Sequence, residues 1–384
     1  MKPSLIFVVT ALLSAAGPVH AQDAPARKNT YHSSGNTAGA APRFVSPEVH
    51  ADRTVTFRIR APKASEAALS FQGMKPMAKD AEGTWSITIG PLAPEIYEYS
   101  FTVDGARALD TANTLLKTGR TLGGNLLEIP GTPPRFDEVR DVPHGSIQMR
   151  TYTSTPLQRR RQLYVYLPPQ YDSEAARRFP VLYLRHGSGD DESTWSLQGR
   201  AGVILENLIA ERKAAPMLIV MTNGDTDYTW AGGSSPEAID LLGKELLGDV
   251  IPLIEKNYRV TANRANRAIT GLSMGGGQAF TIGLKHLDTF AWVGEFSSGL
   301  LSDTEFNLAK HLPGFLDDPA RVNLQLKLLF LSCGTEDPRI PGHLDLMDTL
   351  KARQIRYVWY PTSGAHEWKV WRHSLAEFLP KLFR

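Results

Sequence analysis

The chain has 384 residues, enough for two domains and a sizeable hydrophobic core. Its 42 basic and 40 acidic residues are well mixed and leave a formal net charge of +2, so the sequence offers no basic block of the kind that binds nucleic acid. Cysteine occurs once, at Cys333, which excludes an intramolecular disulfide; its apolar surroundings, "KLLFLSCG", predict a small buried core residue.

Residues 1–21 have the composition of a secretory signal peptide. Lys2 precedes an apolar run from Leu5 to Ala16, and the small residues around Val19 and Ala21 predict cleavage after Ala21. The run is too short to span a bilayer comfortably, and no cysteine follows it to carry a lipid anchor. We therefore expect a periplasmic or secreted protein with no membrane contact after cleavage. Residues 22–42 are small and polar and are predicted to form a flexible lead-in.

Residues 43–130 are predicted to form a small all-β domain. Short segments such as "TVTFRIRAP", "GTWSITIG" and "IYEYSFTVDG" alternate apolar and polar residues, and glycine, proline, aspartate and asparagine separate them. Strands at this spacing, without a helical period between them, indicate an immunoglobulin-like sandwich. The proline-rich stretch within residues 131–144 is predicted to be a linker.

From residue 145 to 384, apolar strand-like runs alternate with helical patterns. Such alternation favours a mostly parallel central sheet with helices on both faces. The expected strands lie at 160–169, 179–187, 216–224, 266–273, 291–298, 326–334 and 355–361, and the clearest helices at 202–214, 235–258 and 343–353.

The sequence Gly271-Leu272-Ser273-Met274-Gly275 fits the pattern G-x-S-x-G. An apolar strand end precedes it, and a helix-like run follows. This pattern is typical of a serine held on a sharp turn between a strand and a helix, where small neighbours let the backbone fold tightly. It predicts Ser273 as a nucleophile, provided that the rest of the chain supplies the partners that a serine needs.

A serine hydroxyl needs a histidine base, and the histidine needs a carboxylate to orient it. In an α/β-hydrolase these groups follow one another as Ser, Asp or Glu, then His. His366, on the loop after the last expected strand, is the candidate base. Glu336 and Asp337 both follow the strand at 326–334, and the residues alone do not decide between them.

The tetrahedral intermediate of ester hydrolysis also needs donors for its oxyanion. In this fold one donor is the backbone N–H of the residue after the nucleophile, here Met274, and the other comes from a loop after an early strand. The stretch "VLYLRHGSG" offers the N–H of Ser188, and His186 is interpreted as bracing this loop. The sequence contains no metal-binding pattern and no phosphate-loop ending after Gly277, so no cofactor is expected.

The C-terminal region resembles the family 1 carbohydrate esterases, a group of feruloyl and acetyl-xylan esterases related to esterase D and the mycolyltransferases. The stretches "LYLRHGSGDDESTW", "GLSMGGGQAF", "SCGTEDP" and "SGAHEWKVWRHSLAEF" carry this resemblance, which covers about 145–384. It implies that Asp337 is the acid and that Ser188 is the second oxyanion donor. Many relatives have a further glycine where Ser188 stands, a change that a backbone donor tolerates.

The N-terminal region resembles the early-set, family 48 carbohydrate-binding modules. The stretches "GTWSITIGPLAPEIYEYSFTVDG" and "DTANTLLKTGR" carry this second resemblance. A row of aromatic residues that would bind a glycan is not evident, because Trp85, Tyr97 and Tyr99 alternate as core residues of strands would. A module that packs on the esterase and shapes its entrance is therefore as good an interpretation as glycan binding.

Together these features predict an exported serine esterase acting on feruloylated or acetylated polysaccharide, with a feruloyl ester favoured. Trp195 and Trp230, on loops after strands, are candidates for contact with an aromatic acyl group, and core packing is the alternative for each. An acetyl-xylan or general aryl esterase, a siderophore trilactone esterase and a glycan-binding protein with an inert esterase domain are the other hypotheses. The oligomeric state stays open, a homodimer included.

Overall fold

The computed structural model describes residues 44–302 and 306–384. The predicted signal peptide and lead-in therefore lie outside the described residues. Within the described ranges, none of the helices combines the length and apolar character that crossing a bilayer requires.

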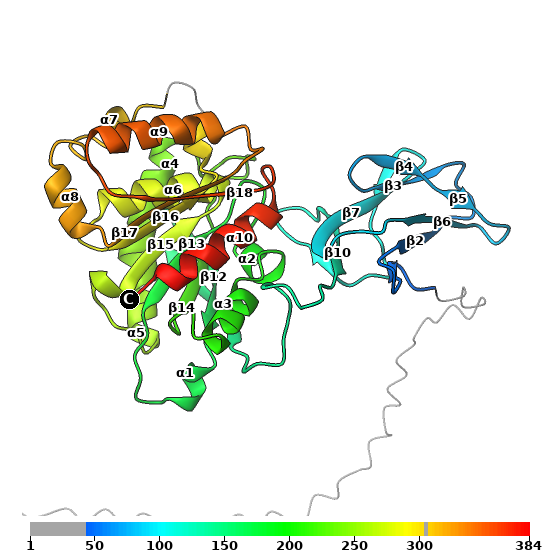
Figure 1. Cartoon of the computed structure of the whole chain (residues 1–384), viewed down its shortest axis with the longest axis horizontal. Helices are drawn as coiled ribbons and strands as arrows, with labels where there is room; N and C mark the ends of the chain where they lie inside the picture. The colour runs from blue at the N-terminus through cyan, green and yellow to red at the C-terminus, as the bar shows by residue number, and fades with distance from the viewer. Residues whose placement is uncertain (1–43, 303–305) are drawn as a thin grey trace, which may run out of the picture. The chain divides into compact units, whose positions relative to one another are not determined.

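The N-terminal part consists of antiparallel strands in two sheets (Figure 1). The sheets share a buried cluster that includes Phe57, Leu69 and Phe101, each 0% exposed. Trp85 and Tyr99 also belong to this cluster, so both are core residues, whereas Tyr97 is only partly buried. The first sheet has the order β1 (Glu48–Val49), β2 (Val55–Arg60), β6 (Thr84–Ile89), β5 (Ala78–Lys79); the second has the order β4 (Met74–Pro76), β3 (Ala67–Ser70), β7 (Glu95–Val103), β10 (Gly124–Ile129), β9 (Leu116–Lys117), with β8 (Ala106–Ala108) beside β7.

The C-terminal part contains one eight-stranded mixed sheet. β11, β12 and β14 pair antiparallel at one edge, and the remaining neighbours pair parallel. The sequence did not predict β11, whose side chains are largely exposed and lack the apolar alternation of a half-buried strand. In spatial order the strands are β11 (Ser146–Ser154), β12 (Arg159–Leu167), β14 (Leu218–Thr222), β13 (Val181–Arg185), β15 (Arg267–Gly271), β16 (Trp292–Phe296), β17 (Leu328–Gly334) and β18 (Val358–Thr362).

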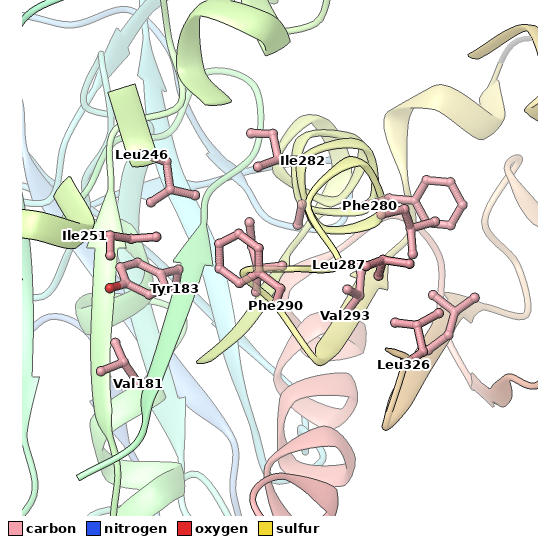
Figure 2. Close-up of a cluster of buried hydrophobic side chains, with 14 of the residues drawn as sticks. Val181, Tyr183, Leu246, Ile251, Phe280, Ile282, Leu287, Phe290, Val293 and Leu326 are labelled. Carbon is pink, nitrogen blue, oxygen red and sulfur yellow. The ribbon is translucent and has the colours of Figure 1, made fainter. Parts of the chain in front are cut away.

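Both faces of this sheet are buried. Successive strand residues point to opposite sides, so alternate residues of one strand belong to different core clusters. Val181 and Tyr183 of β13 belong to one core cluster, part of which is drawn in Figure 2, and Leu182 and Leu184 belong to a second. The first cluster includes residues of α4 (Pro236–Glu245), α5 (Ile251–Asn257), α6 (Ser273–Lys285), α8 (Pro319–Gln325) and α9 (Ile340–Ala352), and the second includes residues of α3 (Ala201–Ala210) and α10 (Trp368–Phe378). Short helices at α1 (Gln170–Ser173), α2 (Thr194–Leu197), α7 (Leu308–His311), η2 (Arg264–Asn266), η3 (Gly299–Ser302) and η4 (Leu379–Lys381) complete the described elements.

The long helix predicted over 235–258 contains a wider turn in its middle. A π-helical segment, η1 (Leu246–Val250), joins α4 to α5. Pro252, the second residue of α5, has no N–H to donate to the preceding turn, which explains why the regular α-helical hydrogen-bonding pattern is interrupted here. The fold that results positions the site: β13, β15, β17 and β18 run parallel, so the loops at their carboxyl ends collect at one edge of the sheet.

Candidate active site

Ser273 lies on the sharp turn that the G-x-S-x-G pattern predicts. Leu272 is still extended, whereas Ser273 opens α6 with a φ of +52°, a conformation that L residues rarely adopt. A Cβ on Gly271 would lie 2.5 Å from the carbonyl oxygen of Gly275, and a Cβ on Gly275 would lie 2.3 Å from the carbonyl oxygen of His186. Because both contacts are closer than any side chain tolerates, the tight turn requires glycine at these two positions.

Three residues from distant parts of the sequence meet at this turn. The Oγ of Ser273 lies 3.0 Å from Nε2 of His366, and Nδ1 of His366 lies 2.7 Å from Oδ2 of Asp337. With the Nδ1–H donating to the carboxylate, Nε2 is free to accept the serine proton. The structure thus brings together Ser273, Asp337 and His366, and not Glu336, whose side chain is exposed.

The environment of Asp337 favours its ionised form. The side chain is 0% exposed, and its Oδ1 also accepts the backbone N–H of Arg339 at 3.0 Å. Burial alone would raise the pKa of Asp337, but the hydrogen bond and positive charge of His366 outweigh burial and lower this pKa to about 2. The carboxylate therefore stays negative at neutral pH and can stabilise an imidazolium that forms when His366 takes a proton.

Of the two predicted oxyanion donors, Met274 directly follows Ser273, and Ser188 lines the same cavity as Ser273. Ser188 is part of a turn over Gly187–Asp190, closed by the Asp190 N–H donating to the Gly187 carbonyl at 3.3 Å. Met274 is the second residue of α6, where backbone N–H groups lack partners within the helix. His186 is buried, and its Nε2 accepts the N–H of Gly224 at 2.8 Å, which agrees with its interpretation as a loop brace.

Ser273 and His366 open into a cavity of about 890 Å³. Trp230 lines this cavity and is 72% exposed, so its indole is available for ligand contact. Trp195 is only 1% exposed, donates its Nε1–H to the Arg185 carbonyl at 2.9 Å and packs against Trp368, which places it in the core rather than at the cavity surface. The alternative of core packing therefore describes Trp195, and we do not propose a ligand contact for it.

The N-terminal part lines this cavity as well, as the interpretation of a module that shapes the entrance of the esterase predicts. Residues of β7 and β9, among them Tyr97, Glu98 and Lys117, face the same space as Ser273. Lys117 and Glu98 form an ion pair at 2.6 Å on this wall. One side of the cavity therefore carries charged groups that can hydrogen-bond to a polar ligand.

A buried ion pair lies next to the site and was not predicted from the sequence. Nε2 of His343 lies 3.1 and 3.2 Å from the two carboxylate oxygens of Glu295, and both side chains are 0% exposed. The Nδ1–H of His343 donates to the Arg339 carbonyl at 2.8 Å. Burial alone would lower the pKa of His343, but the charge of Glu295 outweighs burial and raises it, so the imidazole carries both protons. The sequence feature that could have indicated this pair is the single carboxylate, Glu295, within the apolar strand "AWVGEFSS".

We expect Glu295→Gln to lower the free energy of unfolding by roughly 3–5 kcal/mol, because it leaves a buried imidazolium without its counter-charge. Guanidinium unfolding followed by tryptophan fluorescence measures this loss. The matched control is Glu237→Gln, which changes an exposed carboxylate at the start of α4 and should stay within about 0.5 kcal/mol of the parent. A Glu295→Gln variant as stable as the control would contradict a charged pair.

Comparisons with known proteins show that this chain is similar to esterases. A family model described as a putative esterase matches residues 154–382. An endo-1,4-beta-xylanase/feruloyl esterase of Xylanibacter ruminicola is 32% identical over 349 residues, which cover 88% of this chain and 46% of that protein. The chain thus spans less than half the length of this relative.

Two solved structures are similar in fold. A ferulic acid esterase aligns with a TM-score of 0.53 at 25% identity and covers 62% of this chain and 97% of its own. The enterobactin esterase of Shigella flexneri aligns with a TM-score of 0.64 at 18% identity and covers 85% of this chain and 92% of its own. At that identity the second likeness concerns the fold alone.

Proposed function

The chain belongs to the esterase family, and from this premise we propose that it is an exported serine carboxylic ester hydrolase that releases hydroxycinnamic acid, ferulate above all, from plant cell-wall polysaccharide. One observation carries the mechanism: His366 bridges the hydroxyl of Ser273 and the carboxylate of Asp337 at the floor of the cavity. The name of the Xylanibacter relative supports the choice of acyl group.

In the proposed reaction Ser273 attacks the ester carbonyl while His366 accepts the hydroxyl proton. Asp337 keeps the proton of His366 on Nδ1 and stabilises the positive charge that develops on the ring. The backbone N–H groups of Ser188 and Met274 donate to the oxyanion of the tetrahedral intermediate. His366 then protonates the leaving alcohol, and a water molecule, activated by the same imidazole, releases the acid from the acyl-enzyme.

The walls of the cavity support a substrate with an aromatic acyl group and a polar alcohol. The exposed indole of Trp230 offers a flat apolar surface beside Gly189. The ion pair of Lys117 and Glu98, which lines the same cavity, offers hydrogen-bonding groups to a hydroxyl-rich sugar. We propose that residues 43–130 form a module that resembles a carbohydrate-binding domain and completes this entrance, ahead of a linker at 131–144 and an esterase domain at 145–384.

A panel of esters tests the substrate assignment. We expect release of ferulic acid from feruloylated arabinoxylan oligosaccharide to have a kcat/KM at least about tenfold higher than hydrolysis of acetylated xylan oligosaccharide or of a catechol trilactone. The reason is that only the feruloyl ester offers both an aromatic acyl group to Trp230 and a sugar to Lys117 and Glu98. Each rate is measured by chromatography of the released acid, with Ser273→Ala as the background. A preference for the trilactone would favour a siderophore esterase, and a preference for the acetyl ester would favour an acetyl-xylan esterase.

A further inference from the structure

The segment Thr118–Arg120, between β9 and β10, contacts the loop that carries the predicted oxyanion donor. The backbone N–H of Arg120 donates to the carbonyl oxygen of Gly189 at 3.1 Å. A Cβ on Gly119 would lie only 2.8 Å from the same oxygen, and Gly119 has a φ of +152°. The two backbones therefore lie as close together as peptide groups can, and only glycine permits this approach.

The loop on the other side of this contact is the turn Gly187–Asp190. Gly189, its third residue, has a φ of +78°, which suits a tight turn closed by the hydrogen bond from Asp190 to Gly187. The Ser188 N–H shares its peptide group with the Gly187 carbonyl, and the Asp190 N–H that donates to this carbonyl shares its peptide group with the Gly189 carbonyl. Rotation of the Gly189–Asp190 peptide therefore changes the direction of the Ser188 N–H through this hydrogen bond. The hydrogen bond from Arg120 holds the carbonyl of Gly189 and thereby restricts this rotation.

The ring of Trp230 covers Gly189 from another direction. A Cβ on Gly189 would lie 2.2 Å from the ring, so Trp230 packs directly on the backbone of the turn. The guanidinium of Arg120 donates to the carbonyl of Thr229, the neighbour of Trp230, and lies 3.4 Å from Oδ1 of the buried Asp225. One residue of the segment thus contacts both the turn and the loop that covers it.

The segment is itself fixed to α2. The side-chain amide of Gln198 donates to the carbonyl of Thr118 at 2.7 Å, and the hydroxyls of Thr118 and Ser193 lie 3.2 Å apart. Gln198 is 1% exposed, so this attachment is buried. Because the segment is anchored on α2 and on the loop of Trp230, it can resist displacement of the turn between them.

We propose that Thr118–Arg120 is a positioning element for the oxyanion donor Ser188, so that residues outside the matched esterase region take part in setting the rate of the chemical step. Gly119 and Arg120 act through the turn Gly187–Asp190 and do not touch the substrate. The inference rests on the proposed function, since it assumes that the Ser188 N–H stabilises the oxyanion. It predicts that disturbing the segment lowers kcat even on an ester too small to reach the N-terminal wall.

Gly119→Ala in the full chain is the decisive variant, because its methyl group displaces the carbonyl of Gly189. With p-nitrophenyl acetate we expect kcat to fall about 10- to 100-fold with KM within about twofold of the parent, since loss of one oxyanion donor costs 10²–10³ in kcat. The inhibition constant of a phenylboronic acid, which forms a tetrahedral adduct on the serine, should rise by a similar factor. The inhibition constant of free ferulate should not change.

Gly105→Ala is the matched control. Gly105 is another glycine of the N-terminal part with a positive φ, +79°, and its Cβ would meet nothing within 4 Å. Both substitutions place alanine at a positive φ, but only at Gly119 does the new methyl group meet the turn. We expect Gly105→Ala to retain the parent kcat and the parent boronate affinity.

Arg120→Ala and Arg120→Lys keep the inference testable if Gly119→Ala fails to fold. Arg120→Ala removes the hydrogen bonds to Thr229 and Asp225 and should lower kcat about 10-fold, with the circular dichroism spectrum of the parent. Arg120→Lys should recover part of the loss. A folded Gly119→Ala or Arg120→Ala with parent kcat and parent boronate affinity overturns the proposal. Ser273→Ala separates this outcome from failure of the proposed function. If Ser273→Ala is inactive while Gly119→Ala and Arg120→Ala behave as the parent, only the positioning role is wrong. If Ser273→Ala keeps its activity as well, the proposed mechanism is wrong.

Discussion

Ser273→Ala is expected to lower kcat for methyl ferulate and for p-nitrophenyl acetate by roughly 10⁵-fold or more, because no other group can form the acyl-enzyme. The methyl side chain still fits the turn, whose glycines and positive φ do not depend on the hydroxyl. Steady-state assays with both esters measure the loss. A fluorophosphonate probe should label the parent and leave the variant unlabelled.

Ser173→Ala is the control for this substitution. Ser173 is an exposed residue at the end of α1, and its hydroxyl lies 3.4 Å from the carbonyl of Pro169. Its removal should change neither turnover nor labelling. Undiminished turnover of both esters by Ser273→Ala would rule out the proposed mechanism. A parent protein that did not react with the probe and hydrolysed neither ester would instead revive the hypothesis of a glycan-binding protein with an inert esterase domain.

Asp337→Asn is expected to lower kcat by about 10⁴-fold at neutral pH. The amide keeps the shape of the carboxylate but has no negative charge, and it can turn its NH2 towards Nδ1 of His366 and so favour the tautomer that cannot accept the serine proton at Nε2. The same esters measure this effect, with KM expected to change little. Glu336→Gln is the matched control next to it, and it should retain at least half of the parent kcat because Glu336 is exposed and the ring nitrogens of His366 contact Asp337 and Ser273.

The same substitution should also change how stability depends on pH. The pKa of Asp337 is lowered in the folded state from about 4 to about 2, so its ionised carboxylate stabilises the fold above the unfolded value, by about 2 kcal/mol, and this contribution is lost as the pH falls towards 2. Urea unfolding between pH 2 and pH 6 should show a steeper acid decline for the parent than for Asp337→Asn. Equal slopes would mean that the ion pair with His366 does not stabilise the folded state.

The activity assays also test which residue is the acid. A Glu336→Gln variant with the activity loss expected of Asp337→Asn would reverse the proposed assignment of the acid.

The strongest sequence signal was local. Gly271, Ser273 and Gly275 lie within five residues, and the close contact between Gly271 and the Gly275 carbonyl lies within the turn itself, so the pattern predicted the conformation of Ser273 from local sequence. The second close contact, of Gly275 with the His186 carbonyl, is long-range and appears only in the structure. The alternation of apolar strands and helices similarly predicted the sheet, apart from the exposed edge strand β11. Chain order added His366, because parallel strands deliver successive loops to one edge.

Sequence by itself therefore determined the class of fold, the esterase chemistry and the candidate nucleophile and base. The pattern of the residues left Glu336 and Asp337 open, and only the family resemblance implied Asp337. The tertiary structure shows the physical reason, because the hydrogen bond to Nδ1 of His366 comes from Asp337. It likewise placed Trp195 in the core and Trp230 at the cavity. The pair of Glu295 with His343 and the contact of Arg120 with Gly189 join residues 48 and 69 positions apart, and such contacts leave no periodic trace because each depends on how whole elements pack.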